Sequence, residues 1–205
     1  MLGRRILSVA LCLALVGTEA MAVEEPAFET VLRDGAFEVR DYPALVVAEV
    51  TVGGDQKEAA SRGFRLLAGY IFGGNRRRRS IAISAPMAQA SASEKIAMTA
   101  PVTQTPNANS WVVRFTMPRV YSLETLPEPS RPEVHLRAIP PTRVAILKFS
   151  GVARETTVHA KTAELEKLAA THNLRTTGPV SLAQYDPPWT PWFARRNEVM
   201  ISVTH

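Results

Sequence analysis

The side chains that could carry catalysis or bind a metal are few and widely spaced. Four histidines occur singly, without the spacing of a metal site: His135, His159, His172 and His205. The sequence contains no nucleophile elbow, phosphate-binding loop or zinc-protease motif. His172 lies at the end of a predicted helix, where the helix dipole favours a cation. Each histidine therefore fits a surface or structural role better than metal ligation.

The one cysteine, Cys12, lies in a segment typical of a secretory signal peptide. Two arginines precede an apolar run over residues 6–16, and a small-residue cleavage site ends at Ala22. The run is shorter than the roughly 20 residues that span a membrane. We expect residues 1–22 to be removed and the protein to be periplasmic or secreted.

The mature chain, residues 23–205, would contain no cysteine. That composition excludes disulfides, thiolate metal sites and thiol nucleophiles. Loss of Arg4, Arg5 and Glu19 changes the formal net charge from +5 to +4. Such a mild positive excess favours anionic ligands or surfaces.

The strongest local charge is a run of four arginines: Arg76, Arg77, Arg78 and Arg79. No aromatic residue interrupts the run, and the chain is expected to be exported, so nucleic acid is not the expected partner. Two interpretations stay open. The run is a solvated loop, or it binds an anionic lipid of the cell envelope.

Apolar periodicity predicts the elements that must position these residues. Strands are predicted around a hairpin turn of type I′ at Asp34-Gly35, and then over 44–52, 96–104, 111–117, 134–139, 143–150 and 198–203. Helices are predicted over 55–71 and 155–171. The first helix places four apolar residues on one face: Ala60, Phe64, Leu67 and Ile71.

The two parts of the chain share a pattern. Seven residues have an identical or apolar counterpart 97 positions further on: Arg40, Pro43, Val47, Ala48, Val50, Val52 and Gly54. Duplication of a β-β-α unit explains this register, with chance similarity of two hairpins as the alternative. The predicted single domain, 23–205, has halves at about 27–118 and 133–204, and a cleft between halves is a natural ligand site.

A second, shorter repeat lies within the first half. The stretch IAISAPMAQ returns fifteen residues later as IAMTAPVTQ. Both copies alternate apolar with small or polar residues, which predicts a β-hairpin extension over 81–104. The extension either packs on the fold without touching a ligand or contributes to the ligand site.

Several motifs, in order along the mature chain, resemble the SOUL/heme-binding protein family in its exported bacterial form. They are FEVRDYP, LLAGYIFGGN, KIAMTAPVTQ, WVVRFTMPRVY and YDPPWTPWFARRNEV. The resemblance implies an α+β fold, a distorted antiparallel β-barrel with two helices built from two pseudo-twofold related β-β-α halves. It is similar to effector-binding domains of the gyrase-inhibitor type. It also implies binding of heme, or another tetrapyrrole, in a hydrophobic cleft without a strong axial protein ligand. We expect the protein to be a monomer.

The resemblance also implies where the ligand lies. The matching wall of the first helix is formed by Phe64, Leu67, Ala68 and Ile71, and the proline-rich loop after Tyr185 adds Trp189 and Trp192. Ordinary core packing is the alternative for the helix wall, and packing within the loop is the alternative for the tryptophans. The family has a basic residue near the end of this helix, where this chain has Gly69. Candidates to replace its propionate contact are Arg62 and Arg65, or Arg195 and Arg196.

Three functions compete. The leading prediction is non-enzymatic binding of heme or a related tetrapyrrole. The second is small-molecule hydrolysis of the effector-binding-domain type, with Glu198 or Glu49 as the base in the cleft between halves. The third is an envelope interaction protein that uses the arginine run and the hairpin extension.

Overall fold

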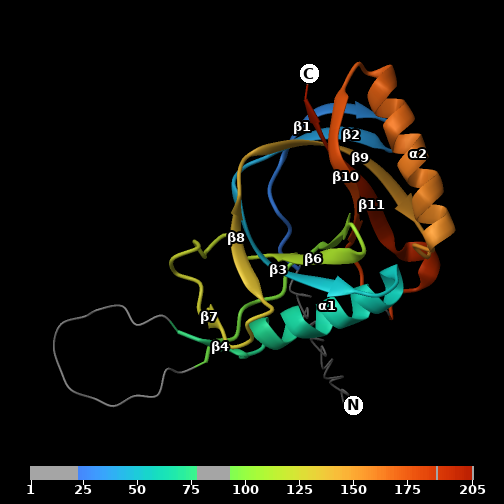
Figure 1. Ribbon diagram of the computed structural model, residues 1–205. Coiled ribbons are helices and arrows are strands. Elements are labelled where there is room, and N and C mark those ends of the chain that lie inside the picture. The colour runs from blue at the N-terminus through green and yellow to red at the C-terminus, as the bar shows by residue number, and fades with distance from the viewer. Residues whose placement is uncertain (1–22, 78–92, 188, 205) are drawn as a thin grey trace, which may run out of the picture.

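The structure, a computed structural model, describes residues 23–77, 93–187 and 189–204. The predicted signal peptide, and residues 81–92 of the predicted hairpin extension, lie outside these residues. The described chain folds into a strongly curved antiparallel sheet with a helix over each end of its outer face (Figure 1). In spatial order the strands are β1 (Glu29–Asp34), β2 (Phe37–Tyr42), β9 (Thr142–Ser150), β11 (Arg196–Thr204), β10 (Arg175–Gln184), β5 (Val102–Asn107), β6 (Ser110–Thr116), β3 (Leu45–Gly53) and β8 (His135–Ile139).

The remaining elements are short or helical. Helix α1 is Gln56–Ile71 and helix α2 is Glu155–Thr171, both within one residue of the predicted bounds. Strands β4 (Asn75–Arg76) and β7 (Glu128–Pro129) form a separate two-stranded ribbon, and a short 3₁₀ helix covers Trp192–Ala194. Among the described residues, no helix is both long and apolar enough to span a membrane.

The two halves are related by a pseudo-twofold axis, as the duplication predicts. Exchanging β2, β3, β5 and β6 with β8, β9, β10 and β11, and reversing the order, reproduces the same sequence of strands from β2 to β8. The register agrees: Arg40 pairs with Val144 between β2 and β9, while Val47 pairs with Arg137 between β3 and β8. The α+β fold class and its two β-β-α halves are thereby confirmed.

Alternation along the strands separates an outer face from an inner face. Outward side chains form one apolar core under α1, around Val50 and Phe115, and another under α2, around Val39 and Val199. The side chains that alternate with these core residues along each strand point to the concave inner face. Each core combines strands of both halves, since Val39 of the first half packs under α2 and Val134 of the second half packs under α1.

Close contact between α1 and the sheet depends on a glycine. A Cβ atom at Gly63 would lie 2.5 Å from Cγ2 of Val113 on β6. The helix begins at Asp55, whose carboxylate accepts a hydrogen bond of 2.8 Å from the backbone N–H of Glu58. Helix α1 therefore buries a face centred on Gly63 and Leu67, and Phe64 lies at its margin.

Three local features differ from the prediction. The first hairpin turns one residue later, at Gly35-Ala36, and of these two residues Gly35 has positive φ. Strand β5 begins at Val102, since Pro101 before it has no N–H to donate, and it pairs with β6 and β10. Strand β10 was not predicted, because Gly178 and Pro179 interrupt its alternation at a bulge.

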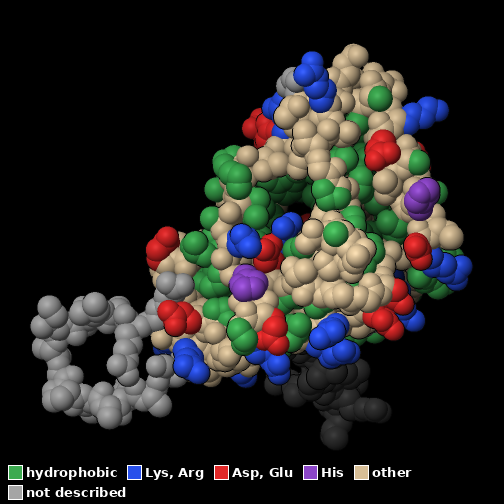
Figure 2. Space-filling model, viewed as in Figure 1, with side chains coloured by type: hydrophobic (Ala, Val, Ile, Leu, Met, Phe, Trp, Pro, Cys, Tyr) green, Lys and Arg blue, Asp and Glu red, His purple; other side chains and the backbone are tan. Residues whose placement is uncertain are grey.

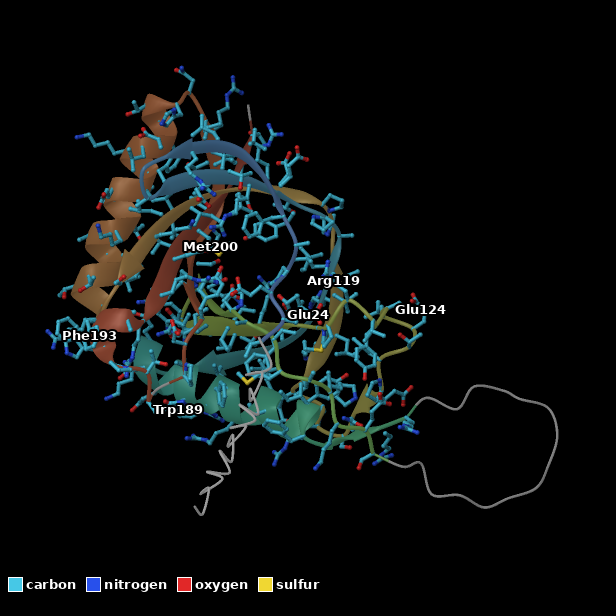
Figure 3. The ribbon with its side chains drawn as sticks, turned by 180° about the vertical axis from the view of Figure 1, so that it is seen from behind. Glu24, Arg119, Glu124, Trp189, Phe193 and Met200 are labelled. Carbon is cyan, nitrogen blue, oxygen red and sulfur yellow. The ribbon has the colours of Figure 1, made fainter. Side chains whose placement is uncertain are left out.

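The N-terminal segment 23–28, here called the strap, crosses from one half to the other. The carbonyl of Glu24 accepts a hydrogen bond of 2.9 Å from the N–H of Ala100 in the first half. Glu25 pairs with Arg196 of β11 in the second half. Phe28 then covers the guanidinium of Arg40, with 4.1 Å from its carbon to the ring centroid. Figure 3 shows Glu24 near Arg119. The carboxylate of Glu24 accepts a hydrogen bond of 3.0 Å from the backbone N–H of Arg119.

Candidate functional site

Helix α1 presents an exposed apolar stripe. Phe64, Ala68 and Phe72 are spaced four residues apart and so lie on one side of the helix. Phe64 is 38% exposed and Phe72 61% exposed. Beside Ala68, a Cβ atom at Gly69 would meet no atom within 4 Å, so the surface there is open. We call these three residues the α1 stripe.

Two members of the predicted helix wall belong to the core instead of the surface. Leu67 is 0% exposed and Ile71 is 1% exposed, both within the core under α1. Sequence analysis did not identify Phe72, although its position eight residues after Phe64 was a usable signal. The accessible wall is therefore formed by Phe64, Ala68 and Phe72.

The loop that joins β10 to β11, residues 185–195, carries three exposed aromatic side chains and is here called the aromatic loop. Trp189 is 82% exposed, Trp192 64% and Phe193 66%. Trp192 and Phe193 meet edge to face, with ring centroids 5.8 Å apart. Figure 3 shows Trp189 and Phe193 at the periphery of the molecule, with Trp189 beside α1 in that view. Phe193 was also missed by sequence analysis.

Hydrogen bonds fix the base of the aromatic loop. The hydroxyl of Tyr185 donates to Glu198 at 2.6 Å, and burial together with this carboxylate raises the pKa of Tyr185 above its usual range. Asp186 accepts a hydrogen bond of 2.6 Å from the backbone N–H of Arg196. The side chain of Arg195 donates to the carbonyl of Thr190 at 2.9 Å. The tryptophans therefore project from an anchored loop.

The sheet register connects Phe64 of the α1 stripe to the base of the aromatic loop. The ring of Phe64 contacts Phe115 of β6 at 5.4 Å between centroids. Phe115 pairs with Val102 of β5, and Val102 pairs with Gln184, the last residue before the aromatic loop. Two strand spacings amount to roughly 10 Å. A ligand on the α1 stripe is thus within reach of this loop.

The four arginines proposed as propionate contacts differ in whether they already pair with a carboxylate of the protein. Arg62 and Arg65 are exposed on α1, and neither has an ion-pair partner among the described residues. Arg196 pairs with Glu25 at 2.5 Å and lies 3.5 Å above the ring centroid of Tyr185. Burial tends to lower the pKa of Arg196, but the hydrogen bond and charge of Glu25, together with the charges of Tyr185 and Glu198, outweigh it and raise this pKa. A ligand carboxylate would have to compete with Glu25 for Arg196, but not for the arginines of α1.

The arginine run is only partly described. Arg76 belongs to β4, and Arg77 donates from Nε to Glu94 at 3.1 Å. Glu94 also accepts a hydrogen bond of 2.6 Å from Tyr121, which raises the pKa of Tyr121 to about 12. Arg78 and Arg79 lie outside the described residues. At least one arginine of the run is therefore engaged with the fold.

The inner face holds a buried charged network, not a free catalytic carboxylate. Arg40 donates to both oxygens of Glu198, at 3.0 and 3.1 Å, and to Glu38 at 2.8 Å. Lys148 donates to the other oxygen of Glu38 at 2.7 Å. Burial favours a higher pKa for Glu38, but the hydrogen bonds from Lys148 and Arg40 prevail and lower it. Glu198 is thus an ion-pair partner in a network that joins β2, β9, β11 and the aromatic loop.

The second candidate base is engaged as well. The carboxylate of Glu49 on β3 accepts a hydrogen bond of 2.7 Å from Nε of Arg114 and another from Nε of Arg137. Each carboxylate oxygen of Glu49 thus accepts a hydrogen bond from a guanidinium group. Both predicted bases are therefore paired with arginines in this structure.

The described histidines lie away from the α1 stripe. His135 is on β8, and His159 is an exposed residue of α2. His172 ends α2 and stacks on Phe37 with ring centroids 5.1 Å apart. These positions fit the expectation of surface or structural roles, and none of the three offers an axial ligand at the α1 stripe.

Two surface hollows occur elsewhere. One of about 430 Å³ follows the outer edge of β8, and one of about 350 Å³ lies beside Phe28 and Tyr42. Neither is lined by a residue of the predicted tetrapyrrole site. Figure 2 shows the face between the halves hollowed at its centre, with hydrophobic side chains around the recess. The α1 stripe is thus an open surface instead of an enclosed cavity.

Comparison with known families gives one match. The sequence model described as "SOUL heme-binding protein" matches residues 23–202, nearly all of the described chain. A search of curated proteins found no match.

Solved structures show the same fold at low sequence identity. The C-terminal domain of EcmrR superposes with a TM-score of 0.59 at 9% identity, covering 82% of this chain and 96% of that one. A hydrolase from Listeria innocua gives a TM-score of 0.54 at 14% identity, covering 85% and 94%. An uncharacterized conserved protein from Listeria innocua gives 0.52 at 13% identity, covering 82% and 92%. At such identities these likenesses show the fold alone.

Proposed function

This chain belongs to the SOUL heme-binding protein family, and from that premise we propose that it binds heme or a related tetrapyrrole on the α1 stripe, without catalysing a reaction. The aromatic loop forms the second side of the proposed site. One observation carries the location: Phe64, Phe72, Trp189 and Trp192 are all exposed, by 38%, 61%, 82% and 64%. Exposed aromatic groups mark a contact surface, and a planar macrocycle stacks well on their rings.

The charges near the site suit the anionic edge of a tetrapyrrole. Arg62 and Arg65 are three residues apart, so both lie on the same side of α1. Their guanidinium groups can each take a propionate in a paired geometry. Arg65 and Arg62 lie about one and two turns before Gly69 in the helix. Gly69 is the position near which the family carries a basic residue. We therefore propose Arg62 and Arg65 as the first propionate contacts, with Arg196 as the competing candidate.

A heme titration followed at the Soret band tests this function, with iron-free protoporphyrin as the comparison. Saturable binding of both compounds is expected, because stacking and propionate contacts do not depend on the iron. Binding of heme alone would point to a histidine ligand and overturn the proposed geometry. If neither compound bound saturably, the proposed function would be wrong while the fold assignment stood.

We also propose that the protein is exported and acts as a monomer. The N-terminal sequence supports export, because a basic start, an apolar run and a small-residue site precede Val23. N-terminal sequencing of protein from the periplasm and culture medium should begin at Val23. A cytoplasmic protein that retained Met1 would contradict the proposal, and a dimer by light scattering would contradict its second part.

A further inference from the structure

Three charged residues meet on the inner face of the sheet, at the end covered by α1. Glu49 on β3 pairs in register with Arg114 on β6, and Arg137 on β8 lies opposite Val47, two residues away. The side chain of Glu49 is 9% exposed and accepts one Nε hydrogen bond from each arginine. A nearly buried carboxylate thus holds two guanidinium groups side by side.

The two guanidinium groups keep unused hydrogen-bond donors. Glu49 takes only the Nε–H of each, and within the described part of the chain no side chain accepts from their terminal nitrogens. The side chain of Arg114 is 32% exposed and that of Arg137 is 62% exposed, so both reach solvent. One carboxylate neutralises only one of two cations, which leaves a net positive charge. This arrangement is a fork for a second anionic group.

A hollow with apolar and polar lining residues adjoins the fork. It follows the free edge of β8, an end strand of the sheet, and measures about 430 Å³. Its lining consists of Leu123, Pro129, Val134, His135, Leu136 and Arg137. Arg137 therefore belongs both to the fork and to the hollow, so one ligand can reach the two together.

We propose that Arg114 and Arg137 bind the carboxylate of a small organic acid whose apolar part lies in this hollow. The site is distinct from the tetrapyrrole surface, because α1 packs on the outer face of β3 and β6, while Glu49 and Arg114 point to the inner face. No residue of the aromatic loop lines the hollow, so a ligand bound there is different from the tetrapyrrole.

Calorimetric titration of the purified protein with octanoate tests the proposal, with octanol and inorganic phosphate as comparison probes. Octanoate should bind saturably and more tightly than either comparison, since it alone supplies both an anion and an apolar chain. Arg114→Gln or Arg137→Gln should weaken octanoate binding about tenfold, the effect of losing one charge-assisted contact. Heme binding should be unchanged in both variants.

Control variants separate the site from general effects of charge and folding. Arg175→Gln removes an exposed arginine of β10 and should leave octanoate affinity unchanged. Arg114→Lys and Arg137→Lys keep the charge opposite Glu49, so they should fold as the wild type does while losing most of the octanoate affinity. Equal octanoate binding in all variants would overturn the site. Binding of phosphate but not octanoate would overturn the assignment to an organic acid.

Discussion

Glu25 and Arg196 tie the N-terminal strap to the start of β11, with 2.5 Å between a carboxylate oxygen and a terminal guanidinium nitrogen. The same guanidinium covers the ring of Tyr185 at 3.5 Å. The carboxylate of Glu25 is therefore already paired with Arg196, the cation at the base of the aromatic loop. If Arg196 serves a bound propionate, Glu25 is its internal competitor.

Glu25→Gln should distinguish between the candidate propionate contacts. If Arg196 contacts the ligand, removing the competing charge should strengthen heme binding by about threefold, a modest effect because both side chains are partly exposed. If Arg62 and Arg65 make the contact, as we propose, the Soret titration of Glu25→Gln should match that of the wild type. Arg62→Gln together with Arg65→Gln should then weaken binding, and unchanged binding in that double variant would contradict the proposal.

Substitutions on α1 should separate ligand contact from core packing. Phe72→Ala, and to a lesser degree Phe64→Ala, should weaken heme binding several-fold with little effect on urea unfolding, because Phe72 is 61% exposed. Leu67→Ala should instead lower the free energy of unfolding by about 2–5 kcal/mol, because Leu67 is fully buried. Loss of stability in Phe72→Ala without loss of heme affinity would show that the α1 stripe is not the site.

The Arg40 network should matter for stability far more than surface ion pairs do. Arg40→Met leaves Glu38 and Glu198 buried without their shared cation, and breaking such a buried pair costs about 3–5 kcal/mol. Urea unfolding at neutral pH measures this loss. Lys161→Gln removes an exposed pair with Glu164 and serves as the control, which should be nearly neutral. A neutral Arg40→Met variant would show that the network is dispensable.

Stability should fall on acidification in a way that depends on Glu38. The pKa of this carboxyl is below its ordinary value of 4.5 in the folded protein, so its contribution is present above that value and is lost as the pH falls through the folded pKa. Glu38→Gln should therefore be less stable than the wild type at neutral pH. The difference should shrink in unfolding curves recorded below the ordinary value, and a constant difference would contradict the assignment.

Two glycines of α1 should respond in opposite directions to alanine. Gly63→Ala places a methyl group 2.5 Å from Val113 and should destabilise the fold by about 1–3 kcal/mol. At Gly69 an added methyl group meets nothing within 4 Å, so Gly69→Ala should raise stability by about 0.5–1 kcal/mol through helix propensity. Thermal unfolding of the two variants, compared with the wild type, checks both signs.

The sequence alone determined the elements with strong local periodicity. Both helices were predicted within one residue, because their apolar spacing and the cap at Asp55 act within a few turns. The shared register of Arg40 with Arg137 and Val47 with Val144 predicted the two halves, and the strand pairing shows the same correspondence. Duplicated segments with one pattern fold alike, so the symmetry was readable before any contact was known.

Only the tertiary structure decided which side chains are accessible and which charges meet. The predicted stripe of α1 was divided by the close approach of Gly63 to Val113, which buries Leu67 and leaves Phe64 at the surface. Arg40 and Glu198 are separated by 158 residues, and no periodicity predicts their contact. Strand β10 was not predicted, because a bulge interrupts the alternation of its apolar and polar residues. Burial and long-range pairing depend on how the strands curve and cross, and local patterns do not contain that information.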